Sequence, residues 1–520
     1  MDTTPAPAYP RTIVLLFMAF LLVPGLLAVI LPEAHTSTSE KRRLAPMPQL
    51  KWSRQSFAAF PGEFEKYFRD HFGLRDQFVI LYNTAFFGLF RTSPRPTVIY
   101  GRDGWLYLSA MGVLPDFMGQ GGDGQHSRRL GQILADRQKW LESLGSRYLY
   151  VPVPNKMEVY PEYLPPRYRR FAGDTLYSRL VDDLSQRRGT VPFIDLLTVF
   201  REGKKTEHLY YRTDTHWNEA GAYLGYRQII DRLQTHFPEI RPITPEQIAM
   251  SDVVYPGDLA LQFHLEDRFR EPARQFFLRN GQDAWQPKRR EDLERQHGMP
   301  GEILLAEAPT GKHTAVIIQD SFGNHLRKYF TQHFRRTFFI TGTSFTKAIP
   351  LIEALRPDVV IDLHVARNIP QAVTPHPRIT AHAAREEFQS LPTALMTMTG
   401  KDFAMLQATN ARIEKGAAST ALLAGNDDPQ LLAELPSTVA GKGGVLRIKL
   451  ESPAATTLQV FYGRGPEKGF VERDSLTWPL ARGTNDIFLR LPESAVFDRL
   501  RIDPGKKAGR YTLLRLELRR

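Results

Sequence analysis

The spacing of apolar and polar positions changes three times along the chain, and each change predicts a different kind of structure. Residues 12–31 carry no charge, and residues 36–95 repeat aromatic positions at helical intervals. Residues 128–363 alternate helix-like and strand-like stretches, and residues 443–520 alternate in short runs typical of strands. A period near 3.6 indicates an amphipathic helix and a period of 2 indicates a half-buried strand.

The uncharged run at residues 12–31 has the length that spans a bilayer as a helix. Pro24 lies within it and is tolerated in such helices. The alternatives are a retained signal anchor and a cleavable signal peptide. The run is longer than a usual signal core and no small-x-small cleavage site follows it, so a single-pass anchor is favoured. Counting the positive charges on either side of the run would place the large domain in the cytoplasm.

The segment at residues 36–95 is expected to be a helical lead-in. Its aromatic side chains recur at roughly helical intervals after a break at Phe60-Pro61-Gly62. The prediction is an amphipathic helix that packs on the main core. Residues 97–108 then predict a β-hairpin around the turn Asp103-Gly104. The recurring aromatic residues are Phe64, Tyr67, Phe68, Phe72 and Phe78.

Residues 128–363 predict an α/β domain, because alternating helices and strands produce parallel strands with helices on both faces. The expected helices are 128–144, 174–187, 220–235, 326–333 and 346–355. The expected strands are 148–153, 191–194, 314–318, 338–341 and 359–363.

Residues 443–520 predict an antiparallel β-sandwich, because short alternating runs are separated by turn residues. The complete domain prediction is a tail and anchor at 1–35, an α/β domain at 36–395 and a β-sandwich at 396–520. Five aromatic residues of the last domain are candidates for stacking on sugar rings, although filling the sandwich core is favoured for each. They are Phe461, Tyr462, Phe470, Trp478 and Tyr511.

Composition narrows the classes of function. A chain of 520 residues is too long for one ordinary core, and 42% hydrophobic with 24% charged residues is typical of a folded globular protein. The absence of cysteine excludes disulfides, iron–sulfur clusters, thiolate zinc sites and a cysteine nucleophile. The net charge of +12 favours acidic partners, but no nucleic-acid-binding motif accompanies it.

Two short stretches carry candidate chemistry. In the first, Asp214 and His216 precede a predicted helix, and an Asp-x-His pair can let the carboxylate orient the imidazole. In the second, Ser321 follows an apolar strand and begins a helix, where backbone N–H groups can form an oxyanion hole. Alone, each stretch is better explained by helix capping or metal binding; together they predict a Ser321–His216–Asp214 triad for acyl transfer. No metalloprotease-type histidine spacing is present, and no metal or cofactor is expected.

At these residues the chain resembles the alginate O-acetyltransferase AlgJ/AlgX-type family, a branch of the SGNH-hydrolase-like proteins. The resemblance covers roughly residues 40 to 370 and implies an SGNH-hydrolase-like sheet, with Asp214, His216 and Ser321 as the triad. One departure is Gln319, where the family usually has Gly, two residues before the serine. The motifs are Gly101-Arg102-Asp103-Gly104-Trp105-Leu106-Tyr107, Val153-Pro154-Asn155-Lys156, Thr213-Asp214-Thr215-His216-Trp217, Gly257-Asp258-Leu259-Ala260, Asp320-Ser321-Phe322 and Pro357-Asp358-Val359-Val360.

The resemblance implies transfer of acetyl groups to hydroxyls of an exported, alginate-like polysaccharide. It implies a multispanning membrane acyltransferase as acetyl donor and a catalytic part in the periplasm of a bacterium, held at the inner membrane. It also implies an AlgX-like carbohydrate-binding module at the C-terminus. The implied periplasmic side sets the orientation, against the charge count.

Further candidate residues surround the predicted triad. The backbone N–H groups of Ser321 and Gly323, assisted by Asn324 or Asn155, are candidates for the oxyanion hole. Lys156 and Arg367 are candidates for orienting acidic sugar groups, with structural pairing as the alternative. Trp217 is a candidate for shielding the triad or lining a glycan groove, with a place in the core as the alternative.

The sequence is also compatible with two other functions. An acetyl esterase would use the same triad with water as the acceptor. A non-catalytic glycan-binding scaffold of an export complex would need no triad, and the presence of all three residue types disfavours it.

Overall fold

The computed structural model describes residues 11–30, 36–37, 42–187, 189–263, 265, 267–279, 286–299, 301–309, 311–416, 420–440, 443–465, 469–492 and 495–520. The chain divides into two compact units, one of residues 1–129 with 149–372 and one of residues 130–148 with 373–520. The domain boundaries expected at 35/36 and 395/396 stay predictions.

The first unit is built on a mixed six-stranded sheet in the order β5-β12-β10-β11-β9-β8. The central strands are parallel, with β10 between β11 and β12, whereas β9 and β8 join antiparallel at one edge. An antiparallel edge on a parallel sheet is common and differs from the all-parallel sheet that the alternation predicted. The strands are β5 (Arg147–Val153), β8 (Lys288–Arg289), β9 (Ile303–Glu307), β10 (Thr314–Gln319), β11 (Arg336–Thr341) and β12 (Val359–Val365).

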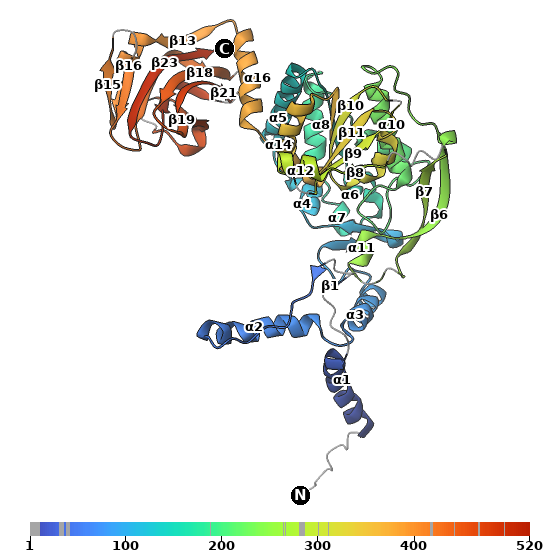
Figure 1. Cartoon of the computed structure of the whole chain (residues 1–520). Coiled ribbons are helices and arrows are strands. Elements are labelled where there is room, and N and C mark those ends of the chain that lie inside the picture. Colours follow the sequence, from blue (N-terminus) through green and yellow to red (C-terminus); the bar gives the residue numbers. More distant parts are fainter. Residues whose placement is uncertain are drawn as a thin grey trace. The chain divides into compact units, whose positions relative to one another are not determined.

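Long apolar strands place this sheet in the core. Every residue of β10 and β12 is buried, as expected for parallel strands covered on both faces. Helices flank the sheet in Figure 1. The helices of at least seven residues after residue 149 of the first unit are α8 (Leu176–Gln186), α9 (Leu196–Gly203), α10 (Glu219–Leu233), α12 (Glu291–His297) and α14 (Phe345–Leu355). Helix α5 (Gly124–Ser143) begins in the first unit and belongs to the second from residue 130. The shorter α-helices of the first unit are α4 (Val113–Pro115), α6 (Lys156–Val159), α7 (Pro166–Arg169), α11 (Asp258–Leu261), α13 (Arg327–Phe330) and α15 (Ile369–Ala372).

Most predicted elements of the α/β region are present, with two differences. The strand expected at 191–194 makes a single parallel bridge, from Phe193 to Tyr150, because Pro192 cannot donate a ladder hydrogen bond. Of the helix expected at 326–333, only the single turn α13 is present, and the 3-10 helix η6 (Ser321–Leu326) precedes it. The hairpin expected at 97–108 is confirmed as β3 (Val98–Tyr100) and β4 (Leu106–Leu108). The antiparallel pair β6 (Ile248–Pro256) and β7 (Arg270–Leu278) was not predicted.

The N-terminal region forms three helices, α1 (Arg11–Ile30), α2 (Arg54–Asp70) and α3 (Arg75–Phe90), with a two-stranded pair β1 (Thr36–Ser37) and β2 (Arg42–Arg43). No helix among the described residues is long and apolar enough to cross a membrane, so the anchor expected at residues 12–31 lacks structural support. The expected packing of the lead-in helix on the main core is wrong for α2, which has no buried residue. In α3, only Asn83 and Phe87 are buried.

The second unit contains the predicted antiparallel β-sandwich. One sheet has the order β15-β16-β23-β18-β21 with β13 also on β23, and the other has the order β14-β17-β22-β19-β20. Alternate apolar side chains of both sheets meet in one buried core. The strands are β13 (Ala394–Thr399), β14 (Gln407–Thr409), β15 (Ala411–Lys415), β16 (Thr420–Ala424), β17 (Gln430–Ala440), β18 (Gly444–Ser452), β19 (Thr456–Gly463), β20 (Ser475–Leu480), β21 (Gly483–Leu491), β22 (Val496–Asp503) and β23 (Gly509–Arg519).

Helix α16 (Pro377–Ser390) belongs to the same unit and packs Phe388 against Phe488 of β21. Of the candidate sugar-stacking residues, Tyr511 and Phe461 are buried, at 0% and 5% exposure. Tyr462 and Trp478 pack partly buried against the sandwich core. Core packing, the alternative favoured for each of these residues, therefore describes Tyr511, Tyr462 and Trp478. Phe461 lies outside that core, against Phe470 and beneath the Arg501 guanidinium.

Candidate active site

Ser321 lies at the C-terminal end of the central strand β10, where η6 begins, and its side chain is exposed. The preceding Asp320 fixes this turn. Its Oδ1 accepts a hydrogen bond from the Phe322 N–H at 3.0 Å. Its Oδ2 accepts from the Val365 N–H and from Asn368 Nδ2, both at 2.8 Å. Asp320 thus caps η6 and ties the serine turn to the end of the neighbouring strand β12.

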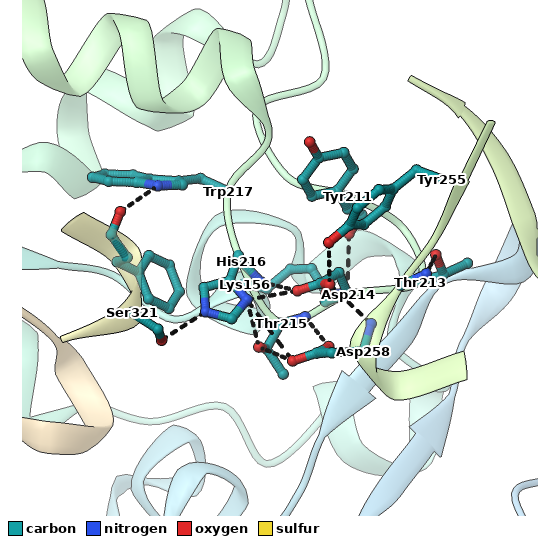
Figure 2. Close-up of polar contacts among 12 residues, drawn as sticks. Lys156, Tyr211, Thr213, Asp214, Thr215, His216, Trp217, Tyr255, Asp258 and Ser321 are labelled. Atoms are coloured by element: carbon teal, nitrogen blue, oxygen red, sulfur yellow. Dashed lines mark hydrogen bonds and ion pairs between the residues drawn. The ribbon is translucent and has the colours of Figure 1, made fainter. Parts of the chain in front are cut away.

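His216 and Asp214 lie in the loop between α9 and α10, which approaches the serine turn (Figure 2). His216 Nε2 is 2.7 Å from Ser321 Oγ, and His216 Nδ1 is 2.7 Å from Asp214 Oδ1. The loop is closed by a bridge between Tyr210 and Trp217. Residues separated by 105 positions therefore form a serine–imidazole–carboxylate relay within hydrogen-bond distance.

The Asp214 carboxylate is held by several donors at once. Oδ1 also accepts from the His216 N–H at 2.9 Å. Oδ2 accepts from the Tyr255 hydroxyl at 2.9 Å and from the Asp258 N–H at 2.8 Å. Burial alone would raise the pKa of Asp214, but the hydrogen bonds and charge of His216, with the backbone donors, hold that pKa well below its usual range. The carboxylate therefore stays ionised and fixes the orientation of the imidazole.

Asp258 supports the same loop from a second side. Its carboxylate accepts hydrogen bonds from the Thr215 N–H and hydroxyl, both at 2.8 Å. Burial, followed by the nearby Asp214 charge, raises the pKa of Asp258. Asp214, His216 and Asp258 offer ligand atoms within 4.8 Å of one another, a spacing that could hold a cation. In the structure, however, these atoms already pair with one another or with Thr215.

Lys156 has a different position from that expected of a residue that orients acidic sugars. It is 4% exposed, and its Nζ donates to the carbonyl oxygens of Tyr211 and Arg212 at 3.1 Å and of Asp214 at 2.6 Å. Burial lowers the pKa of Lys156 to about 8. All three donors of the ammonium group thus bind the loop that carries Asp214 and His216 (Figure 2).

Gln319, the departure from the family pattern, packs directly beneath η6. It is fully buried, and a Cβ added to Gly323 would lie 2.4 Å from Gln319 Cδ and 2.7 Å from its Cβ. With its amide oxygen turned towards Arg327, Gln319 accepts from Arg327 Nη2 at 3.0 Å and Nε at 2.9 Å. The Gly323 N–H, a candidate oxyanion donor, donates instead to the Asp320 carbonyl at 3.1 Å, and Asn324 is exposed.

The remaining candidates lie on either side of the serine turn. Asn155 is buried at the start of α6 and its Oδ1 accepts from Arg367 Nη1 at 3.5 Å. The Arg367 guanidinium is 5.3 Å from the centre of the Phe322 ring, and burial lowers its pKa. Trp217 is fully buried and donates from Nε1 to the Phe322 carbonyl at 3.1 Å, which joins the histidine loop to η6. Trp217 is therefore a core residue.

Sequence reasoning missed Tyr255 and Asp258 as partners of Asp214 and Thr215. For Asp258, the sequence offered one signal, which is the glycine that precedes it in the motif Gly257-Asp258-Leu259-Ala260. A Cβ on Gly257 would lie 2.1 Å from the backbone carbon and oxygen of Thr213, so glycine allows this segment to approach the loop. Tyr255 carried no such signal, because its role depends on the unpredicted pair of β6 and β7.

The fold and the site define a class: an α/β domain in which an exposed serine follows a central strand of the sheet and contacts a histidine. Residues 98–322 match the family described as the SGNH hydrolase-like domain of the acetyltransferase AlgX. This match confirms the resemblance to the AlgJ/AlgX-type family that the motifs indicated.

Relatives of known name agree with this class. The chain is 26% identical over 234 residues to a probable alginate O-acetylase AlgJ of Pseudomonas syringae, a stretch that covers 42% of this chain and 57% of that protein. It is 29% identical over 129 residues to the AlgJ of Pseudomonas aeruginosa, covering 25% and 31% of the two chains. The chain therefore spans less than two thirds of either relative. The structure of the O-acetyltransferase domain of Pseudomonas putida AlgJ matches 56% of this chain and all of that domain, with 16% identity and a TM-score of 0.37.

Proposed function

We propose that the chain is a polysaccharide O-acetyltransferase that carries the acetyl group on Ser321. The observation that carries the proposal is the relay from Ser321 Oγ through His216 to Asp214, with two contacts of 2.7 Å. The family match and the names of the relatives support the reaction class and the polysaccharide acceptor.

In the first half of the reaction, Ser321 Oγ attacks the acetyl carbonyl while His216 Nε2 takes the hydroxyl proton. The resulting imidazolium is stabilised by ionised Asp214 and returns the proton to the leaving group. The Ser321 N–H, at the start of η6, and the amide of Asn155 are the proposed donors to the oxyanion. The product is acetyl-Ser321.

In the second half, a sugar hydroxyl attacks acetyl-Ser321. His216 takes the proton of that hydroxyl, the tetrahedral intermediate collapses, and the proton returns to Ser321 Oγ. The acetyl ester moves to the sugar and the serine is regenerated. With water as the acceptor, the same steps would release acetate, which is the esterase alternative.

We further propose that the acetyl donor is a multispanning membrane acyltransferase, that residues 12–31 are a retained anchor, and that the catalytic part lies in the periplasm. The uncharged run of twenty residues supports attachment. An exported acceptor requires the site to lie outside the cytoplasm. A reporter enzyme fused after Arg520, active only in the periplasm, tests this side of the membrane, and activity of a cytoplasm-specific reporter would contradict it.

Intact-mass measurement of the protein with an activated acetyl ester tests the reaction. Wild type should gain one acetyl group and lose it faster when a uronate oligosaccharide is added. Ser321→Ala should gain none, whereas Ser390→Ala, the same change at an exposed serine of α16, should behave as wild type. Equal discharge with and without sugar would favour the esterase, and no Ser321-dependent adduct in folded protein would favour the scaffold.

A further inference from the structure

Helices α2 and α3 display apolar side chains that the rest of the described chain does not cover. On α2, Phe57, Phe64 and Phe68 are 47%, 39% and 43% exposed, and they share one face because they are spaced by seven and four residues. Trp52, just before the helix, is 98% exposed. A helix with one aromatic face is normally buried on that face. Here the described residues leave each of the three phenylalanines at least 39% exposed.

Aromatic contacts make this face continuous with α1. Rings meet in sequence from Phe60 to Phe64, Phe68 and Phe72, with centroids 5.6–6.4 Å apart. Phe72 then contacts Phe78 of α3 at 6.3 Å, and Phe78 contacts Phe20 of α1 at 5.4 Å. The aromatic face therefore joins the apolar helix that begins the described chain.

Helix α3 connects this face to the α/β unit. Phe87 packs edge-on against Phe263 at 4.9 Å, and Asn83 Nδ2 donates to the Phe263 carbonyl at 2.7 Å. On other sides of the same helix, Leu81 and Leu89 are 64% and 77% exposed. One side of α3 is thus fixed to the folded unit, while other sides remain apolar and uncovered.

Charge indicates what covers the face. Residues 41–54 contain five basic side chains and no acidic one. Basic residues beside an aromatic amphipathic helix are the combination that binds an anionic bilayer surface, with Trp and Phe in the headgroup region. A soluble protein partner would not account for the continuity with the apolar α1.

We propose that the aromatic face of α2, with Trp52 and the exposed side of α3, lies in the interface of an anionic lipid bilayer. This attachment is separate from acyl transfer and does not require α1 to span the membrane. It would hold the serine site at a fixed distance from the lipid surface through the contact of α3 with Phe263.

Quenching of Trp52 by brominated lipid tests the proposal on the full chain. The protein is added to vesicles of phosphatidylcholine and phosphatidylglycerol whose acyl chains carry bromine, and Trp52→Phe isolates the contribution of this tryptophan. Wild type should show blue-shifted, quenched emission that Trp52→Phe lacks. Emission of Trp52 that is unquenched, with or without other proteins present, would overturn the proposal.

A pair of triple variants separates the aromatic face from the apolar run at residues 12–31, which all variants retain. Phe57→Gln/Phe64→Gln/Phe68→Gln should abolish Trp52 quenching, because each phenylalanine withdrawn from the bilayer weakens partitioning by about tenfold. The matched control Gln55→Ala/Glu63→Ala/Lys66→Ala changes exposed residues on the polar side of α2 and should leave quenching unchanged. Equal quenching in both triple variants would overturn the proposal, provided that circular dichroism shows both folded.

Discussion

The Asp214 carboxylate accepts hydrogen bonds from two backbone N–H groups, a tyrosine hydroxyl and the imidazole. Only the last of these bonds belongs to the proton relay. The others fix the plane of the carboxylate, so that Nδ1 of His216 is held and Nε2 faces Ser321. At the scale of single residues, therefore, the reactivity of Ser321 in the proposed acyl transfer depends on donors that never touch it.

Tyr255→Phe tests this dependence. The change removes the donor at 2.9 Å from Asp214 Oδ2 and keeps the ring, which stacks on Tyr211 at 4.2 Å. Loss of a hydrogen bond to a charged group costs about 1.5–3 kcal/mol, so we expect kcat to fall by about 10- to 100-fold with little change in KM. Steady-state kinetics on an acetyl ester measure this. Tyr211→Phe, which preserves the stack, should retain activity, and an unchanged kcat in Tyr255→Phe would contradict the positioning role.

Lys156 links stability to pH in a defined direction. Burial lowers the pKa of Lys156 from 10.5 to about 8, so the folded chain releases the ammonium proton at a lower pH than the unfolded chain does. Between pH 8 and 10.5 the unfolded chain therefore binds more protons than the folded chain at this site. Stability contributed by this group rises with pH through that window, by about 3 kcal/mol at most.

Lys156→Met should remove that rise and leave three carbonyl oxygens of the histidine loop without their donor. We expect the melting temperature of wild type, measured relative to that of the variant, to increase between pH 7.5 and pH 9.5. We also expect the variant to lose activity at both pH values because the loop is released. Parallel melting curves for the two proteins across this range would show that the ammonium group is not desolvated as the structure indicates.

At the scale of elements, the serine turn depends on how closely β10 approaches η6. Gly323→Ala would place its methyl group 2.7 Å from the Cβ of Gln319, in a fully buried contact. Overpacking of this kind costs about 1–3 kcal/mol and should shift Ser321 away from His216. We expect lower activity and a lower melting temperature than in wild type.

A second substitution at Gln319 tests whether the effect of Gly323→Ala comes from its contact with Gln319 or from a general loss of stability. Gln319→Gly introduces the residue usual in the family and removes the clashing Cβ, whereas Gln319→Ala keeps it. The Gly double variant should therefore regain activity, apart from about 1 kcal/mol lost through glycine in a strand. The Ala double variant should not. Both double variants also lose the two hydrogen bonds that Gln319 accepts from Arg327, so this loss does not separate them. Equal activity of the two double variants would refute this account of the turn.

The sequence was sufficient to predict most of the α/β elements and five of the eleven sandwich strands, because these depend on short periods. That Ser321 and His216 lie together, 105 positions apart, was predicted only by combining two motifs with the family resemblance. Asp214 and His216 are two residues apart, and Ser321 follows a fully apolar strand. The roles of Lys156 and Tyr255 depend on side chains that meet only after folding, and no local pattern encodes such meetings. The aromatic stripe of α2 showed which face is apolar but not what covers it, so its predicted burial against the main core was wrong.

At the scale of the whole molecule, the net charge of +12 favours an anionic polysaccharide as the acceptor of the proposed transfer. Long-range attraction between exposed charges is screened as salt rises, whereas the chemistry between Ser321 and a neutral ester is not. The charge therefore predicts a salt effect on acceptor use that is separable from the effect on acylation.

Increasing sodium chloride from about 20 mM to about 300 mM should raise the KM for a uronate polymer several-fold, because the Debye length falls from about 20 Å to about 6 Å. The KM for a neutral polymer and the rate of acylation by a neutral ester should change little. Transfer assays with both polymers, matched in length, measure the difference. If both KM values respond equally to salt, charge does not select the acceptor, and recognition must instead depend on contacts that uronate and neutral sugars share.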